Sequence, residues 1–263
     1  MSIDTPSAPV RLYALEAPTL TIDAGDLVVG LEGMVTIPCP AFLIQHPQGV
    51  VMFDTSFAPE AFDDPVGEYG DLVDLISLRF DPAHRLDRQL EKIGLSVDDV
   101  TDVILSHGHA DHSGGLRLFP HARFFIGPEE LDRYDDPPAE VAHLYRQADI
   151  APIDRASWTE VTPDGLDLFG DGTVRLIHAP GHSPGQLMLL VQLAEEQILL
   201  TGDAVHLQEG LDQLKPDGVS WDDDASLATI REIRAMRDAG VHVWIAHDPR
   251  HWAAHRKAPE YYA

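Results

Sequence analysis

Three imidazoles and a carboxylate lie within one short segment of the chain. Residues 106–115 read Ser-His-Gly-His-Ala-Asp-His-Ser-Gly-Gly and follow a short apolar run. His107 and His109 are two residues apart, so in an extended loop both rings project to one side and can bind one cation through nitrogen. Asp111 and His112 follow at an expected helix start and are aimed at a second cation. The segment therefore predicts a site for two metal ions.

Three further residues with metal-binding side chains come at the ends of predicted strands. His182 can complete the shell of the first cation, and His247 can complete that of the second. Asp203 offers two carboxylate oxygens that can bridge both cations. Mixed imidazole and carboxylate donors favour zinc, with iron, manganese and cobalt as alternatives. The predicted ligand set of two divalent cations is His107, His109, Asp111, His112, His182, Asp203 and His247.

The other histidines, and the single cysteine, fit simpler interpretations. His178 comes four residues before His182 and is interpreted as a supporting or strand-end residue. Cys39 is interpreted as a small buried apolar group, and one cysteine excludes both an internal disulfide and a zinc site built from thiolates. Surface or packed positions are expected for His46, His84, His121, His143, His242, His251 and His255.

The elements that must position the ligands mix strands and helices without strict alternation. Such a pattern predicts sheets packed on each other with helices outside. Residues 55–84 read as an irregular loop whose aromatic residues either form a lid or binding wall or simply pack on the surface. Strands are expected at 35–37, 41–44, 50–53, 103–105, 123–126, 174–177, 186–191, 197–200 and 241–245, and helices at 85–93, between 128 and 148, and from 222–224 to 240.

Length and composition predict one domain. With 263 residues, of which 44% are hydrophobic, residues 10–263 can bury one substantial core. Residues 1–9 are polar and rich in proline, which predicts a flexible tail. No apolar run approaches the roughly 20 residues of a membrane span, and the first residues lack the features of a secretory signal. A cytoplasmic protein that contacts no membrane is therefore expected.

The charge balance narrows the expected partners. Aspartate and glutamate number 44 against 18 lysines and arginines, and the net charge is -26. Such a charge repels nucleic acid, so a nuclease is disfavoured. The acidity is also typical of proteins that stay soluble in concentrated salt, where carboxylates are screened from one another. A preference for arginine codons combined with ordinary surface acidity is the alternative explanation.

The ligand pattern resembles the metallo-β-lactamase superfamily, and the resemblance runs from about Val35 to His247. It implies an α+β fold, a four-layer αβ/βα sandwich of two mixed β-sheets flanked by helices. Within the superfamily, residues 41–55 and 96–107 look like the N-acyl homoserine lactonase branch. That likeness implies two metals and hydrolysis of a lactone ring, as in quorum quenching. It also implies that Asp54 orients a metal-binding histidine.

One position departs from the lactonase pattern. Lactonases of this branch usually carry a tyrosine three residues after the bridging aspartate, where its hydroxyl can contact the lactone carbonyl. This chain has His206 there. The imidazole either donates a similar hydrogen bond, which makes His206 a candidate catalytic residue, or is merely packed. The substitution bears on both the rate with homoserine lactones and the identity of the substrate.

The expected mechanism is attack by a metal-bridging hydroxide on the lactone carbonyl. Two divalent cations lower the pKa of a shared water and stabilise the tetrahedral oxyanion. Asp111 is the predicted catalytic residue that takes up a proton and returns it to the leaving alkoxide. The expected partner is thus a small-molecule lactone or ester, and a homodimer is compatible with this interpretation.

Three alternatives have different distinguishing marks. A thioester, phosphotriester or other ester hydrolase of the same superfamily keeps the metals and changes the substrate, although the region after residue 207 has too little positive charge to favour an anionic thiol conjugate. An iron oxygenase or flavodiiron-like protein would need redox-active metal, and the flavodiiron pattern has glutamate at the position of His109. A metal-binding module without catalysis is least favoured.

Overall fold

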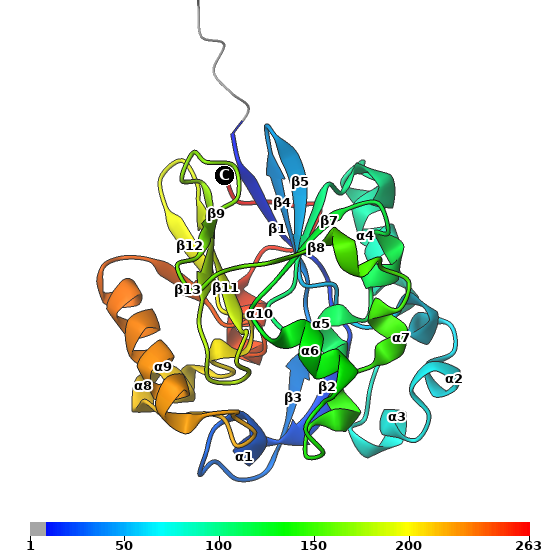
Figure 1. Ribbon diagram of the computed structural model, residues 1–263, viewed down its shortest axis with the longest axis vertical. Helices are drawn as coiled ribbons and strands as arrows, with labels where there is room; N and C mark the ends of the chain where they lie inside the picture. The colour runs from blue at the N-terminus through cyan, green and yellow to red at the C-terminus, as the bar shows by residue number, and fades with distance from the viewer. Residues whose placement is uncertain (1–8) are drawn as a thin grey trace, which may run out of the picture.

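The computed structural model describes residues 9–263 as two β-sheets packed face to face with helices on both outer sides (Figure 1). The first sheet has the order β1-β4-β5-β6-β7-β8, antiparallel from β1 to β5 and parallel from β5 to β8. Its strands are β1 (Arg11–Ala14), β4 (Phe42–His46), β5 (Gly49–Phe53), β6 (Asp102–Ile104), β7 (Arg123–Ile126) and β8 (Trp158–Glu160).

The second sheet has the order β13-β12-β11-β10-β9 and is antiparallel except for the parallel pair β12 and β13. Both main sheets are therefore mixed. A separate hairpin extends from the sandwich at the bottom of Figure 1. The strands of the second sheet are β9 (Leu166–Asp167), β10 (Val174–His178), β11 (Leu187–Gln192), β12 (Gln197–Leu200) and β13 (His242–Trp244), and the hairpin consists of β2 (Thr19–Asp23) and β3 (Met34–Pro38).

Helices cover the outer face of each sheet. In Figure 1, α4 and α7 lie beside the first sheet, and α8 and α9 lie beside the second. The helices are α1 (Ala24–Leu27), α2 (Pro65–Tyr69), α3 (Leu72–Leu75), α4 (Leu86–Lys92), α5 (Ala110–Ser113), α6 (Glu130–Asp135), α7 (Gln147–Ile150), α8 (Gln208–Gln213), α9 (Asp223–Asp238) and α10 (Pro249–Ala254). The predicted four-layer sandwich is confirmed.

The strands are apolar on both faces because each sheet is covered twice. Along β11, Leu187 and Leu189 point into the core between the two sheets, whereas Met188 packs under α9 with Ile230 and Ile233. Alternate side chains of one strand therefore belong to different cores, as the period of two in a strand requires. This double burial explains why the sequence reads as continuous apolar runs rather than as an alternating pattern.

The longest helix begins and ends as the sequence predicts. The Asp222 side chain accepts a hydrogen bond from the Ala225 amide at 2.9 Å and caps the start of α9. Gly240 follows its end with a φ of 100°, a left-handed conformation in which a side chain would be strained. Gly94, which follows α4, likewise has a positive φ of 79°.

The expectation of an irregular loop at 55–84 is wrong. The segment contains α2 and α3, together with two short 3-10 turns. Its aromatic rings pack on one another: Phe57 lies 5.3 Å from Tyr69 and 5.5 Å from Phe80 between ring centroids, and Phe62 lies 5.1 Å from Phe80. The segment is therefore a small helical layer with its own apolar cluster.

Two further features concern the ends of the described chain. The C-terminal segment pairs with the outer edge of β1, where Leu12 and Tyr262 exchange two backbone hydrogen bonds of 2.9 Å. The predicted tail at 1–9 falls outside the described residues except for Pro9, which is exposed.

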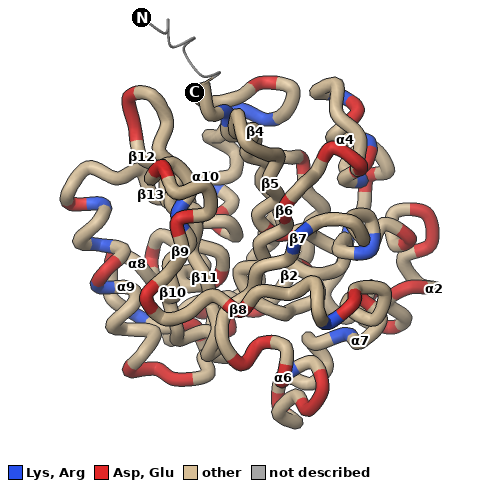
Figure 2. The backbone as a smooth tube through the Cα atoms, turned by 45° about the horizontal axis from the view of Figure 1, so that its top comes forward, with Lys and Arg blue, Asp and Glu red and all other residues tan. Residues whose placement is uncertain are grey.

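Among residues 9–263, no helix combines the length and the apolar character needed to cross a membrane. Figure 2 shows acidic residues along many outer loops and helices.

Candidate metal centre

The predicted ligands come from loops and turns that follow strands of both sheets. His107 and His109 lie in the loop after β6, and Asp111 and His112 lie in α5, which begins directly after His109. From the second sheet, His182 lies in the loop between β10 and β11, Asp203 lies in a 3-10 turn after β12, and His247 follows β13. The structure brings all seven together.

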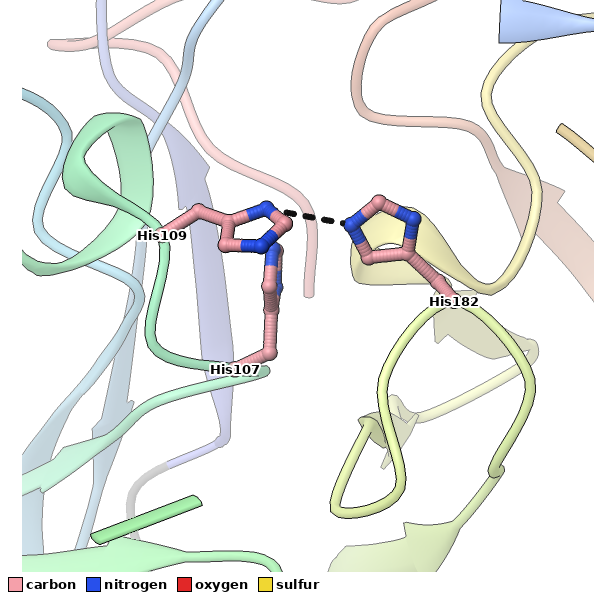
Figure 3. Close-up of side chains that lie close together, drawn as sticks. All are labelled: His107, His109 and His182. Carbon is pink, nitrogen blue, oxygen red and sulfur yellow. Dashed lines mark hydrogen bonds between the residues drawn. The ribbon is translucent and has the colours of Figure 1, made fainter. Parts of the chain in front are cut away.

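One group of ligand atoms consists of three imidazoles. His182 Nε2 and His109 Nδ1 lie 3.1 Å apart, and with His107 they place ligand atoms within 4.8 Å of one another. Figure 3 shows His107 and His109 on one loop and His182 facing them from another. Burial lowers the pKa of His107 and of His109 well below the usual value, and the neighbouring imidazoles lower it further. These rings are therefore neutral and present nitrogen lone pairs to a cation.

A second group forms around His112 and His247. Their Nε2 atoms lie 3.2 Å and 3.1 Å from Asp203 Oδ1, and 3.6 Å and 3.7 Å from Asp111 Oδ2. Burial opposes protonation of His112, but the carboxylates of Asp203, Asp111 and Asp54 together raise its pKa well above the usual value. Two imidazoles and two carboxylates therefore converge on one point.

Asp203 lies between the two groups. Its Oδ1 faces His112 and His247, whereas its Oδ2 lies 3.8 Å from His107 Nε2 and 3.7 Å from His182 Nε2. Burial opposes ionisation of Asp203, but His112 and the other imidazoles hold the pKa of this carboxyl well below its usual range. One carboxylate oxygen thus faces each group, the arrangement required of a bridging ligand.

The donor set fits two cations. His107 Nε2 is buried and has no hydrogen-bond partner among residues 9–263. Buried polar atoms without partners are costly unless another group satisfies them. Nitrogen and oxygen donors of this kind suit zinc and other divalent transition metals. The orphaned nitrogen belongs to the group formed by His107, His109 and His182.

Residues around the ligands hold the histidine rings in place. The Asp54 carboxylate binds His112 Nδ1 at 2.9 Å through Oδ2 and the Ser106 amide at 2.7 Å through Oδ1. His247 Nδ1 donates to the Pro38 carbonyl at 2.6 Å. Each contact fixes a ring and leaves Nε2 free for a cation. The supporting contact of Asp54 with His112 agrees with the expectation from the family resemblance.

Two neighbouring residues were not predicted from the sequence. Asp217 is 5% exposed, and its Oδ1 lies 3.3 Å from His182 Nδ1. Nothing in the sequence marks this aspartate, because its segment carries no motif. Cys39 is buried, as predicted, but its sulfur also lies within 4.8 Å of ligand atoms of Asp111 and His247. Burial raises the pKa of this thiol to about 12, so in the metal-free protein it stays protonated.

His206 lies inside the site rather than at its edge. It is 5% exposed, and its Nε2 is 3.0 Å from Asp203 Oδ2. Its ring stacks on that of His247 with an angle of 10° and a centroid distance of 5.7 Å. The imidazole therefore contacts the bridging carboxylate directly. Its catalytic role stays a prediction. His178 supports the neighbouring loop by hydrogen bonding the Pro184 carbonyl at 2.8 Å.

The fold and the histidine and aspartate centre define a class. Residues 35–239 match the family model of the metallo-beta-lactamase superfamily. The chain therefore belongs to that superfamily.

The relatives narrow the similarity within the superfamily. The chain is 32% identical to a protein named N-acyl homoserine lactonase AttM from Rhizobium radiobacter, over 97% of this chain and 99% of the relative. A solved N-acyl homoserine lactone hydrolase with N-hexanoyl-L-homoserine at its catalytic metal centre shares the fold, with a TM-score of 0.82 at 22% identity over 97% of this chain and 100% of that one. AidC, described as a dizinc quorum-quenching lactonase, has a TM-score of 0.71 at 16% identity, over 96% of this chain and 92% of AidC.

Proposed function

We propose that the protein is a metal-dependent hydrolase that opens the ring of N-acyl homoserine lactones. The observation that carries the proposal is the position of Asp203, with one oxygen facing each of two ligand groups. The similarity to AttM over nearly the full length of both chains supports the substrate class. We propose zinc as the metal on the strength of the donor set, with iron, manganese and cobalt as alternatives.

The chain's own residues would hold the two cations, transfer a proton and orient the bridging carboxylate or the substrate. His107, His109 and His182 would hold one cation, and Asp111, His112 and His247 the other, with Asp203 shared between them. A pair of divalent cations supplies activation of water and polarisation of a carbonyl. Burial of the imidazoles keeps bulk water from competing for these positions.

Asp111 would handle the proton. Its side chain is 19% exposed, whereas those of His112 and His247 are each 1% exposed. Asp111 is therefore the ligand whose carboxylate can reach a substrate entering from solvent. In lactone hydrolysis, the carbonyl carbon to ring oxygen bond breaks, and the leaving alkoxide needs a proton. A carboxylate beside the reacting carbon can take this proton from the attacking water and deliver it to the alkoxide.

His206 would orient the bridging carboxylate or contact the substrate. In the structure its Nε2 can donate to Asp203 Oδ2. A ring that loses this bond on substrate binding can instead donate to the lactone carbonyl, the contact that the family resemblance implies for the tyrosine of the lactonase branch. Both roles use the same hydrogen atom, so the substrate complex decides between them.

The decisive experiment assays a panel of substrates with enzyme of known metal content. Acyl homoserine lactones, thioesters and phosphotriesters are compared at equal metal occupancy. We expect the highest kcat/KM with the lactones, loss of activity on chelation, and its recovery with zinc. The alanine variants of His109 and Asp203 should be inactive although folded. A preference for a thioester or phosphotriester would replace the substrate assignment, and full activity of either folded variant would overturn the mechanism.

Several coarser expectations stay predictions with simple tests. Cell fractionation checks the cytoplasmic location. Sedimentation distinguishes a monomer from the homodimer that the sequence allows, and a gel-shift assay checks the expected lack of nucleic-acid binding. A single cooperative unfolding transition would support one domain over 10–263.

A further inference from the structure

A buried carboxylate outside the ligand set joins the two loops that supply the first ligand group. Glu130 begins α6 and is 0% exposed. Its Oε2 accepts hydrogen bonds from the Gly108 amide at 3.0 Å and from the Tyr145 hydroxyl at 3.3 Å. Its Oε1 accepts one from the Gly185 amide at 3.1 Å. Gly108 lies between His107 and His109, and Gly185 lies in the loop of His182.

The two loops belong to different sheets. The Gly108 loop follows β6 of the first sheet, whereas the Gly185 loop joins β10 to β11 of the second. Figure 3 shows the three histidines of these loops facing one another across a gap. The geometry of this group therefore depends on the separation of two loops that are far apart in sequence. A zinc to nitrogen bond of about 2.0 to 2.1 Å tolerates an error of only about 0.2 Å.

The packing around Glu130 is tight enough to fix that separation. A Cβ at Gly127, in the turn between β7 and α6, would lie 1.7 Å from the Gly185 carbonyl oxygen. A Cβ at Gly185 would lie 2.4 Å from the Pro128 carbonyl oxygen and 2.5 Å from Glu130 Cγ. The turn that leads into α6 thus contacts the His182 loop backbone to backbone. The Glu130 carboxylate joins this packed turn to the His107/His109 loop through its hydrogen bond with the Gly108 amide.

The carboxylate suits this position because its donors match its two oxygens. Burial raises the pKa of Glu130, and the Ser183 hydroxyl together with the Gly185 and Gly108 amides acts in the opposite direction. Three hydrogen bonds are divided between the two Glu130 oxygens, and two of them come from backbone amides, one in each loop. An amide or alcohol side chain has no pair of acceptors that could bind both loops in this way.

We infer that Glu130 is a positioning residue that sets the distance between the His107/His109 loop and the His182 loop, and thereby the metal affinity of the first group alone. The inference rests on the proposed two-cation centre. Within residues 9–263, the hydrogen bonds of Glu130 reach none of the residues of the second group. Loss of the carboxylate should therefore weaken one site and spare the other.

Two variants separate length from charge. Glu130→Gln keeps the length but turns an amide NH₂ toward one of the two backbone donors. Glu130→Asp keeps the charge but is one methylene too short to span both loops. Loss of a supporting carboxylate typically weakens metal affinity about 10- to 100-fold. We expect both variants to show this loss at one of the two sites and an unchanged affinity at the other.

The matched control is Asp149→Asn. Asp149 is also 0% exposed, but it pairs with Arg117 and Arg146 and contacts neither loop. The Asp149→Asn protein should bind both cations with the affinities of the unsubstituted protein. Tyr145→Phe removes only one of the three donors and keeps the ring beside His109, so it serves if the Glu130 variants fail to fold. A smaller loss, of a few fold and again at one site, is expected there.

Two readouts are needed. The first is titration of metal-free protein with Co²⁺ against a chromogenic chelator, which resolves the two sites. The second is amide hydrogen exchange at Gly108 and Gly185 in the metal-free protein, which should accelerate in the Glu130 variants only. Unchanged binding at both sites, equal loss at both, or unchanged exchange would overturn the inference. If the unsubstituted protein binds no metal, the proposed function fails, whereas the exchange result still tests the contact.

Discussion

Replacing Asp54 by asparagine tests whether the support of one histidine controls one cation. The Asp54 carboxylate binds His112 Nδ1 at 2.9 Å and the Ser106 amide at 2.7 Å, and all three residues are buried. Asparagine has the same shape. Its backbone is suitable too, because Asp54 has a φ of 60° and asparagine adopts this left-handed conformation readily. Asp54→Asn therefore changes the hydrogen bonding and leaves the chain path intact.

The expected loss follows from the donors that remain. An asparagine oxygen can accept from Ser106 or from His112, but not from both, and its NH₂ then faces the other donor. If the NH₂ faces His112, it favours the tautomer with the proton on Nε2, the nitrogen that the cation needs. A hydrogen bond to a charged group contributes about 1.5 to 3 kcal/mol. That range corresponds to about a 10- to 150-fold loss of affinity.

The assay is titration of the metal-free protein with Zn²⁺ in competition with a chromogenic chelator. We expect the affinity of the site that contains His112 to fall 10- to 100-fold, as is usual for such support, while the other site stays unchanged. Asp102→Asn is the control, since Asp102 is as buried but pairs with Arg123 at the far end of β6. Unchanged affinity at both sites in a folded Asp54→Asn protein would refute the reasoning.

Three other predictions follow from separate features. His206→Phe removes the hydrogen bond to Asp203 but keeps a ring, so kcat/KM for lactones should fall by about tenfold or more. His206→Tyr should retain most of the activity. Equal activity of the two variants and the unsubstituted protein would show that His206 is merely packed. Salt screens the repulsion within the -26 charge, so the midpoint of urea unfolding should be higher in 2 M KCl than in 0.1 M KCl. An equal midpoint in the two salt concentrations would remove the high-salt hypothesis. The His255 ring stacks on Trp244, and burial lowers its pKa to about 4. As the pH drops from 6.5 toward 4, the unfolded chain binds a proton at this position before the folded chain does, so the stability falls. In urea melts His255→Phe should reduce this fall, whereas the control His143→Phe, at an exposed position, should not.

The convergence of the seven candidate ligands was predictable because their signal is local. The spacing of His107 and His109 and the positions of Asp203 and His247 after apolar runs can be read along the chain. Strand ends place such residues at the edge of a sheet whatever the exact packing. The double burial of β11 likewise produces a continuous apolar run that the sequence displays directly.

The missed features depend on contacts between distant segments. Asp217 supports His182 only because the segment after α8 folds back over the site, where the Trp221 amide donates to the His182 carbonyl at 3.1 Å. No sequence pattern encodes that approach. The helices α2 and α3 span five and four residues, too short for a hydrophobic period to show. One signal was present, since Asp64 caps α2 and Pro65 occupies its first position.

The pairing of Tyr262 with β1 bears on how separate copies of the protein avoid one another. An open strand edge is a template for pairing between molecules, and the two hydrogen bonds at Leu12, with a third from the Ala258 amide to the Ala14 carbonyl, occupy part of this one. In dilute buffer the negative charge also keeps copies apart. Concentrated salt removes that repulsion but leaves the backbone pairing intact, so the last residues would be the safeguard against fibrous association in the conditions where the acidic surface no longer helps.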